Sequence, residues 1–223
     1  MRLLERLPRE TGRDYALRTL TENIINLDLA PGCFVSESEL AGKMGLSRTP
    51  VREAIIELSK VKIIEVTPQK FSRIARIDYE LVEESRFLRV VTECAAVELA
   101  CSQARPEDIQ QLEEILHLQQ FYYSHGMLTR LMSADNQFHN LIFSIAHKSQ
   151  VYDLIQNFSI HFDRVRRMSL ESVNDLKIVE DHAAILNAIR SKDSDQALAL
   201  MKRHLSRYKV DADSIRKKYH QYF

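Results

Sequence analysis

Glycine and proline are scarce in this chain of 223 residues, which holds five of each. Beyond about residue 78, only Pro106 and Gly126 interrupt the sequence. Both residue types break helices, so their scarcity there predicts a helical domain, and no strand-like alternation competes with that interpretation. Hydrophobic residues make up 45% of the chain, which allows a proper core and argues against extended disorder.

Cysteine is rare too, and long apolar runs are missing. The three cysteines are scattered without a Cys-x-x-Cys pair, which fits a reducing cytosol better than a secreted disulfide scaffold. We expect Cys94 and Cys101, seven apart in a helical pattern, to be core thiols. No apolar run approaches the roughly 20 residues that cross a bilayer, and no signal-peptide segment opens the chain. These features predict a soluble, cytoplasmic protein with no membrane partner.

The chain has no net charge, but the charge is divided unevenly along it. Residues 1–77 hold 13 Lys or Arg and 10 Asp or Glu, whereas residues 78–223 hold 18 and 21. A modestly basic front suits a polyanionic partner for that part alone. The content of helix breakers changes at the same place, so we expect one domain over 1–77 and a second over 78–223.

The first domain shows three helical patterns followed by two strand patterns. Apolar residues recur with helical spacing over 15–29, 37–44 and 47–64, and Gly45 can supply the positive φ of a tight turn between the last two. The segments IIEVTP and FSRIARI then alternate as strands around a turn at 68–70. This order predicts a winged helix-turn-helix, whose third helix enters the major groove of DNA.

Arg48 and Arg52 lie at the start of that third helix, on the side away from its buried stripe. Arginine at this place can bind guanine O6 and N7 with two hydrogen bonds, worth about 1–3 kcal/mol of discrimination. The alternative is that both are ordinary solvated charges, as lone arginines on helices usually are. The neighbouring Pro50, the turn at Gly45 and the following ribbon favour DNA reading.

The segment DLAPGCFVSESELAGKMGLSRTPVREAIIELSKVKII resembles the DNA-binding module of the GntR family of bacterial transcription regulators. The resemblance covers roughly residues 15–77. It implies that Arg48 and Arg52 contact the operator and that Ser47 and Thr49 are placed to touch its phosphates. We therefore expect double-stranded operator DNA as a partner.

Two positions in this segment depart from the family pattern. Lys62 stands where a glycine usually follows the recognition helix. The wing turn PQKFS also has no glycine, which leaves Lys70 as the candidate for a minor-groove contact.

The second domain reads as a run of helices with short interruptions. The expected helices are 79–103, 106–124, 128–146, 150–168, 178–191 and 193–219. They predict an all-α bundle of six helices, so the fold class is mainly α with a small wing.

Four side chains in this bundle could meet at a metal ion. Asp135 and His139 stand at i and i+4, on one helix face, while His182 and His204 come from two later helices. Imidazoles with a carboxylate suit a divalent transition metal such as Zn, Ni or Mn. On spacing alone, however, such a pair occurs often by chance, and the other histidines have no comparable context.

The segments RVVTECAAVELA, DNQFHNLIFSIA and DHAAILNAIRSKDSDQALALMKRHL resemble the FCD ligand-sensing domain of the FadR-type branch of GntR regulators. The resemblance implies that Asp135, His139, His182 and His204 bind a metal. Members that bind fatty acyl-CoA generally lack this set, and the short length suggests the VanR-like subgroup. Arg89 matches a family arginine that often pairs with an effector carboxylate.

Together these features predict a homodimeric transcription regulator and not an enzyme. A small carboxylate bound at the metal would control affinity for a palindromic operator. Two alternatives stay open: a regulator whose metal is structural or is itself the signal, and a hydrolytic enzyme whose metal activates water.

Overall fold

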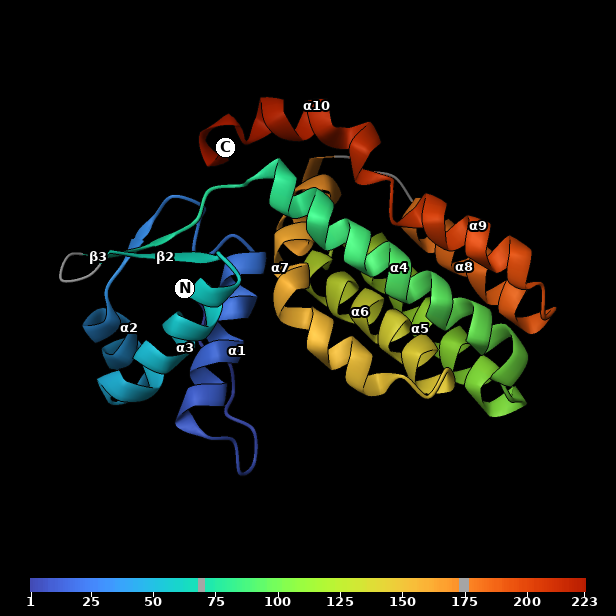
Figure 1. The fold of residues 1–223 in the computed structure, drawn as a ribbon, viewed down its shortest axis with the longest axis horizontal. Coiled ribbons are helices and arrows are strands. Elements are labelled where there is room, and N and C mark those ends of the chain that lie inside the picture. Colours follow the sequence, from blue (N-terminus) through green and yellow to red (C-terminus); the bar gives the residue numbers. More distant parts are fainter. Residues whose placement is uncertain (68–70, 173–176) are drawn as a thin grey trace.

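The computed structural model describes residues 1–67, 71–172 and 177–223, and only the backbone of residues 208, 210 and 211. Figure 1 shows two units side by side along the long axis, a small one of helices and strands and a larger one of helices. No helix in the described ranges is long and apolar enough to cross a membrane. The mainly α fold class predicted from the sequence is confirmed.

The N-terminal unit contains three helices and a three-stranded antiparallel sheet in the order β1-β3-β2. Its elements are α1 (Gly12–Ile25), β1 (Phe34–Val35), α2 (Glu37–Met44), α3 (Arg48–Lys60), β2 (Ile64–Thr67) and β3 (Phe71–Ile74). The two-residue strand β1 was not predicted. It pairs Phe34 with Arg73 across the ladder, while β2 pairs Ile64 with Ile74. The turn predicted at 68–70 lies outside the described residues.

Helix α3 is held in place by its apolar stripe and by the turn before it. Val51, Ala54 and Leu58 are fully buried, because the 3.6-residue period places them on one face. Gly45 ends α2 with φ of +65°, the left-handed conformation that glycine adopts most readily. Ser47 then begins α3 as its N-cap residue, in extended backbone.

The larger unit contains only helices in the described residues. They are α4 (Tyr79–Gln103), α5 (Pro106–Ser124), α6 (Leu128–Ile145), α7 (Ser149–Ser172), α8 (Lys177–Arg190), α9 (Ser194–His204) and α10 (Tyr208–Lys218), followed by the 3₁₀ helix η1 (His220–Tyr222). Helices α4 to α9 form the bundle. Cys94 and Cys101 are buried in its core, as predicted.

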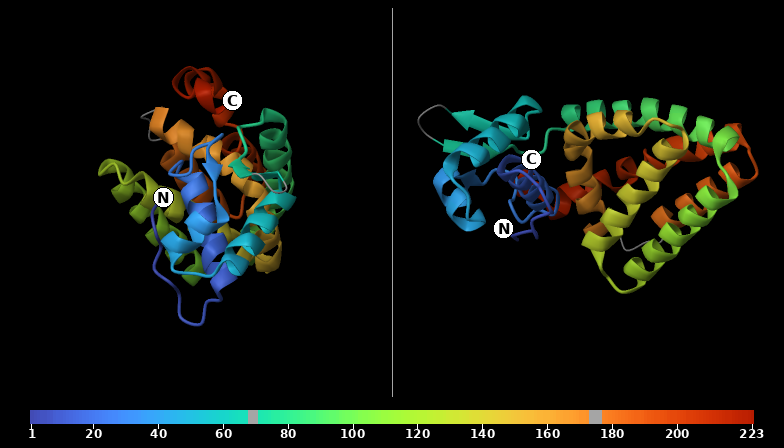
Figure 2. Two further views of the ribbon diagram at one scale, coloured as in Figure 1. Left: turned by 90° about the vertical axis from the view of Figure 1, so that its left-hand side faces the viewer. Right: turned by 90° about the horizontal axis from the view of Figure 1, so that it is seen from below.

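The prediction of one continuous helix over 193–219 is wrong. The chain leaves the helix after His204 and begins α10 at Tyr208. At the break, the guanidinium of Arg207 contacts the carboxylate of Asp181 on α8, and Ser206 turns its hydroxyl onto the carbonyl of Lys202, 2.8 Å away. Residues 208–223 thereby form a separate arm, which crosses above the bundle toward the N-terminal unit (Figures 1 and 2).

This C-terminal arm (residues 208–223) packs on the link between the two units. The backbone amide of Ile77 donates to the carbonyl of Tyr222 at 2.7 Å, and Arg76 donates to the carbonyl of Phe223 at 2.9 Å. The ring of Phe223 stacks on Tyr79 with centroids 5.2 Å apart. The link is therefore covered by a fixed set of contacts.

Helix α7 forms the main direct contact between the units. Ile160 belongs to the apolar core of the N-terminal unit. His161 Nε2 donates to the carbonyl of Val61 at 2.7 Å, and Arg164 donates to the carbonyl of Ala75 at 2.7 Å. Both side chains are fully buried, and each hydrogen bond joins a polar group of α7 to a carbonyl of the N-terminal unit. We call His161 and Arg164, with these two carbonyls, the domain seam.

The domain seam should make stability depend on pH. Burial, with a further contribution from Arg164, lowers the pKa of His161 to about 4, although its bond to Val61 opposes the shift. Between about pH 6.5 and pH 4 the unfolded chain therefore binds a proton at His161 that the folded protein does not. As the pH is lowered through this window, the free energy of unfolding should decrease. His161 contributes up to about 1.4 kcal/mol of this loss per pH unit. Urea unfolding of wild type and His161→Gln at pH 7.5 and pH 5 measures it, and equal losses in both would contradict the assignment.

Candidate DNA interface and metal centre

The predicted DNA-contacting residues that the structure describes lie together at the start of α3. Ser47, Arg48, Thr49 and Arg52 are all exposed and occupy the N-cap position and the first turns of the helix. The free N–H groups of a helix start carry partial positive charge, which suits a phosphate. Lys70 lies outside the described residues, so its predicted wing contact stays a prediction.

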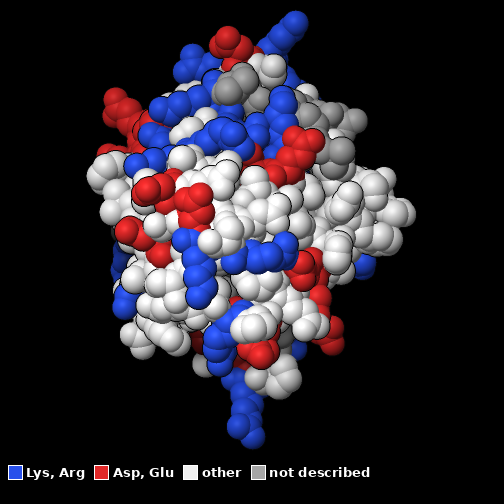
Figure 3. All heavy atoms as spheres, turned by 90° about the vertical axis from the view of Figure 1, so that its right-hand side faces the viewer, with Lys and Arg blue, Asp and Glu red and all other residues white. Residues whose placement is uncertain are grey.

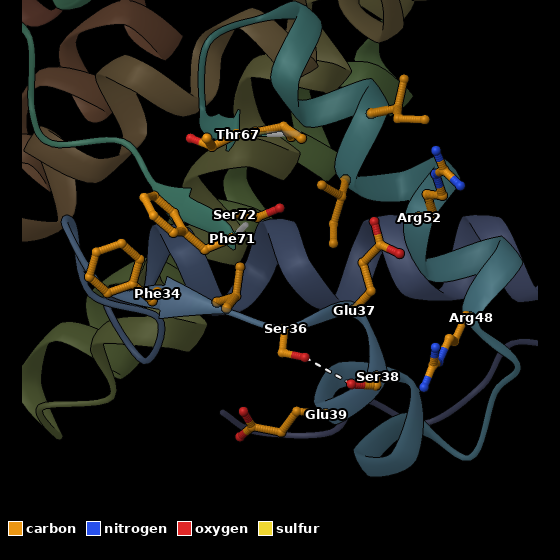
Figure 4. A pocket seen from close by; sticks show the side chains of 14 residues that line it. Phe34, Ser36, Glu37, Ser38, Glu39, Arg48, Arg52, Thr67, Phe71 and Ser72 are labelled. Atoms are coloured by element: carbon orange, nitrogen blue, oxygen red, sulfur yellow. Dashed lines mark hydrogen bonds between the residues drawn. The ribbon is translucent and has the colours of Figure 1, made fainter. Parts of the chain in front are cut away.

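A groove of about 600 Å³ runs between this helix start and the wing sheet. Figure 4 shows Arg48 on one wall, opposite the N-terminal end of α2, and Arg52 one turn further along α3. Ser36 and Ser38 share a hydrogen bond of 2.9 Å at the start of α2, and Glu37 projects between the arginines and the sheet. The groove thus offers arginine donors and hydroxyl groups along one edge, the combination that reads bases and phosphates.

The end of the helical bundle farthest from α3 carries charges of both signs. In Figure 3, Lys and Arg side chains are interleaved with Asp and Glu side chains over this face, with a largely uncharged band between them. A polyanion would meet attraction and repulsion in similar measure there.

The four predicted metal-binding side chains meet in the bundle. Asp135 and His139 come from α6, His182 from α8 and His204 from the last residue of α9. One potential ligand atom from each lies within 4.8 Å of the others, and all four residues are buried. We call this set the Asp/His centre. The spacing argument on Asp135 and His139 placed them correctly, and the later helices bring in the other two.

The nitrogen atoms of the three imidazoles point at one another. Nε2 of His204 lies 3.2 Å from Nε2 of His182 and 3.3 Å from Nε2 of His139. Among the described residues, no donor satisfies the buried Oδ1 of Asp135, which lies 3.7 Å from His182 Nε2. The centre therefore gathers three nitrogens and one carboxylate oxygen around a single point.

The opposite nitrogens of the rings decide where the protons are. Gln119 donates from Nε2 to the carbonyl of Ala134 at 3.1 Å, so its oxygen must face His182 Nδ1, 2.7 Å away, and that nitrogen carries the hydrogen. Nδ1 of His139 contacts the carboxylate of Glu93, and Nδ1 of His204 lies 3.6 Å from Asp181. Gln119 thus leaves an inward lone pair on Nε2 of His182, and carboxylates lie on the outer sides of the other two rings, an arrangement that suits a metal cation at the three Nε2 atoms.

The charges in the centre suit the same ion. Burial, and then the neighbouring His204, lower the pKa of His182 well below its usual range. Burial also lowers the pKa of His204, although Asp181 opposes the shift. Burial would raise the pKa of Asp135, but Arg166 and the three histidines outweigh it and hold that pKa well below its usual range. The lowered pKa values favour neutral imidazoles at His182 and His204 and an ionised carboxylate at Asp135, the forms that bind metal.

Arg89 lies behind the centre and is engaged with carboxylates. Its Nε donates to Glu93 at 2.6 Å, its Nη1 is 3.8 Å from Asp163, and its guanidinium lies over the ring of Phe162 at 5.1 Å. Burial would raise the pKa of Glu93, but Arg89 and His139 lower it to about 2. Arg89 thus keeps Glu93 ionised and aimed at His139.

Comparison with known proteins identifies the family of the chain and its two domains. Residues 15–74 match the family described as bacterial regulatory proteins of the gntR family, and residues 84–207 match the FCD domain. The chain is 30% identical over 217 residues to the HTH-type transcriptional repressor RspR of Escherichia coli, covering 97% of this chain and 95% of that one. The chain belongs to the GntR family. It is a bacterial DNA-binding transcription regulator with an FCD domain, and not an enzyme.

Other GntR relatives extend the likeness. A regulator from an unstable DNA locus of Streptomyces ambofaciens is 31% identical over 213 residues, covering 93% of this chain and 87% of that one. The structure of E. coli McbR/YncC superposes with a TM-score of 0.80 at 20% identity, covering 94% of this chain and 99% of that one, which shows the shared fold. The C-terminal arm, residues 208–223, lies beyond the matched FCD range.

No role at the centre was predicted from the sequence for three side chains that surround it in this GntR protein. Glu93 stands four residues after Arg89 on α4, a signal that was present in the sequence. Gln119 and Arg166 come from other helices, 63 residues from His182 and 31 from Asp135, and no local pattern marks them.

A substitution of Glu93 tests whether the residues behind the metal ligands contribute to metal affinity. Replacing it by glutamine removes the negative charge that fixes the His139 ring, so we expect the metal affinity to fall about 10- to 100-fold. Titration against a chromogenic chelator measures the affinity. Glu98→Gln is the matched control, because Glu98 is exposed on the same helix, and it should bind metal as the wild type does. Equal affinity in both variants would contradict the role of Glu93.

Proposed function

We propose that this GntR protein is a homodimeric regulator whose operator affinity is set by a small carboxylate bound at a divalent metal in the Asp/His centre. One observation carries the proposal: three imidazole Nε2 atoms converge with an unpartnered carboxylate oxygen in a buried position. The same four residues are those that the FCD resemblance assigns to a metal.

The proposed ligands are Asp135, His139, His182 and His204. This donor set suits Zn, Ni or Mn and would leave coordination positions on an octahedral ion for the carboxylate of an effector. The bound ion would supply charge and chelation, which favours sugar acids, hydroxy acids or dicarboxylates as the effector class. Because Arg89 is bonded to Glu93, we propose that it acts in effector binding indirectly, by holding the Glu93 carboxylate behind His139.

The DNA side of the proposal assigns Arg48 and Arg52 to base edges, and Ser47 and Thr49 to phosphates. Lys70 keeps its proposed wing contact. Two copies related by a two-fold axis would present two α3 helices to a palindromic operator in the cytoplasm. We place the domain boundary at 77/78 and the chain in the VanR-like subgroup, whose short FCD domain the six-helix bundle fits.

Helix α4 offers surface for the second copy. Phe87 and Val91 are one helical turn apart, and 67% and 52% of their surfaces are exposed. Contiguous exposed apolar surface can mark an interaction site, and these two side chains share one face of α4. A self-complementary contact through this face would build the two-fold dimer that operator reading requires.

One alternative remains beside the carboxylate sensor. The metal could stabilise the fold or act as the signal by itself, since any ion that binds only the folded state shifts its equilibrium. In that case operator affinity would respond to metal but to no organic acid. The hydrolytic enzyme considered from the donor set is set aside, because the family consists of regulators.

Operator titrations with and without acids test the proposal. An operator is selected from a random duplex pool, and its affinity for metal-loaded protein is measured with citrate, malate, gluconate and lactate. We expect at least one acid to change the affinity by about tenfold, the effect of a coupling free energy near 1.4 kcal/mol. A response to zinc alone supports the metal-only alternative, and no response to any addition contradicts control through this site.

A further inference from the structure

Helix α7 touches the Asp/His centre at one point and the DNA-binding unit less than two turns away. Arg166 Nη1 contacts Asp135, a residue of the centre. Its Nη2 donates to Asn136 Oδ1 at 2.6 Å and lies 3.2 Å from Asp163 Oδ1. Arg166 is buried and holds α7 to α6 through the very carboxylate proposed as a metal ligand.

The domain seam begins on the preceding residues of the same helix. Arg164 is fully buried, donates to the carbonyl of Ala75, and donates from Nη2 to Nδ1 of His161 at 3.3 Å. Ile160 lies in the core of the N-terminal unit. Figures 1 and 2 show α7 passing directly beside that unit, with α4 along its length.

The two carbonyls of the domain seam lie at the end of the recognition helix and at the base of the wing. Val61 is the C-cap residue of α3, the helix proposed to enter the major groove, and Ala75 follows β3 of the wing. The amide of Ala75 donates to the carbonyl of Ile63 at 2.9 Å, which ties the two places together. A shift of α7 would therefore move the end of the recognition helix and the base of the wing as one body.

Arg166 has two carboxylates within reach, and they lie on different helices. Asp135 is on α6, whereas Asp163 is on α7 itself, three residues before Arg166. A divalent cation on Oδ1 of Asp135 would repel the guanidinium that contacts Oδ2 and draw negative charge away from it, which weakens the contact of Arg166 with Asp135. In this structure Arg166 bridges both carboxylates, and Asp163 also lies near Arg89. If the contact with Asp135 is weakened, Asp163 on α7 remains as its carboxylate partner, and the tie between α7 and α6 loosens.

We infer that α7 couples the two units: Arg166 bridges Asp135 and Asp163 when the Asp/His centre is empty and keeps only Asp163 when an ion occupies it, and His161 and Arg164 pass the resulting shift of α7 to α3 and the wing. The inference rests on the proposed function for the occupant of the centre. Coupling between distant sites requires a structural element with two states whose balance both sites can shift. We infer that α7 is this element, between the Asp/His centre and the DNA-binding unit.

Hydrogen exchange tests the coupling without reference to DNA. Amide exchange at residues 58–66 and 72–77 is measured in full-length protein with Zn²⁺ and with EDTA. We expect Zn²⁺ to change exchange in these segments several-fold in the wild type. In Arg166→Gln, measured at a Zn²⁺ concentration that saturates its centre, we expect these segments no longer to respond. Arg190→Gln, a surface arginine paired with Glu113 on α5, is the control and should respond as the wild type does.

A second variant keeps the test open if Arg166→Gln fails to fold. Asp163→Asn removes the alternative partner and leaves the contact with Asp135, and it should also abolish the response. A wild type in which Zn²⁺ changes exchange only within residues 128–190 overturns the coupling, as does a normal response in Arg166→Gln.

The proposed function and the coupling can fail separately. If Zn²⁺ changes exchange at 58–66 and 72–77 but neither Zn²⁺ nor any acid changes operator affinity, the proposed function fails and the coupling stands. If operator affinity responds while these segments do not, the coupling is overturned and the function stands.

Discussion

Replacing His139 by alanine is expected to leave the protein with little or no bound metal, whereas the wild type should hold about one ion per chain. His139 contributes one of three inward Nε2 atoms, and its Nδ1 is fixed by Glu93. Its loss removes a ligand and leaves a buried Glu93 that has lost one of its two partners. Elemental analysis of tag-free protein after exposure to Zn, Ni and Mn measures the content, with His204→Ala as a second ligand variant.

The control for this measurement is His117→Ala. His117 is exposed on α5, away from the centre, and its loss should leave the metal content unchanged. Circular dichroism shows whether His139→Ala keeps its helices. Full metal content in both ligand variants would remove the Asp/His centre from the proposal and leave a DNA-binding protein whose signal enters elsewhere.

Replacing Arg52 by alanine should abolish specific operator binding while the protein stays folded. Arg52 is exposed on the second turn of α3 and is the proposed partner of a base edge. A lost bidentate pair costs about 1–3 kcal/mol per half-site, and a dimer loses it twice. We therefore expect specific affinity to fall at least tenfold and to approach that for unrelated duplex.

A mobility-shift titration with operator and unrelated duplex at one salt concentration measures this effect, because affinities at different salt concentrations cannot be compared. Lys60→Ala is the matched control: it removes a cation from the last turn of the same helix, where Lys60 pairs with Glu57. If Arg52→Ala still prefers its operator by the wild-type ratio, another residue reads the bases.

Local patterns in the sequence predicted the parts of this fold that depend on neighbours along the chain. The face shared by Asp135 and His139 follows from their i, i+4 spacing, and the turn at Gly45 follows from its freedom at positive φ. The break after His204 did not follow from spacing. It is accompanied by the contact of Arg207 with Asp181, 26 residues away on another helix.

The surroundings of the metal centre could not be predicted for the same reason. Gln119 fixes a ring of His182 from a different helix, and Arg166 reaches Asp135 across the bundle. The effector contact predicted for Arg89 stays a prediction, and the structure adds that Arg89 contacts Glu93 and Asp163 behind the centre. Tertiary contacts decide such roles, and a single sequence holds no direct record of them.

The domain seam limits how freely such regulators could exchange parts by recombination. A hybrid gene that joined this DNA-binding unit to another FCD domain at residue 77 would keep the carbonyls of Val61 and Ala75 but lose His161 and Arg164, their donors. Each buried carbonyl left without a donor costs about 1–3 kcal/mol. A viable hybrid would therefore have to inherit this stretch of α7 along with the N-terminal unit, although some 85 residues separate them in the gene.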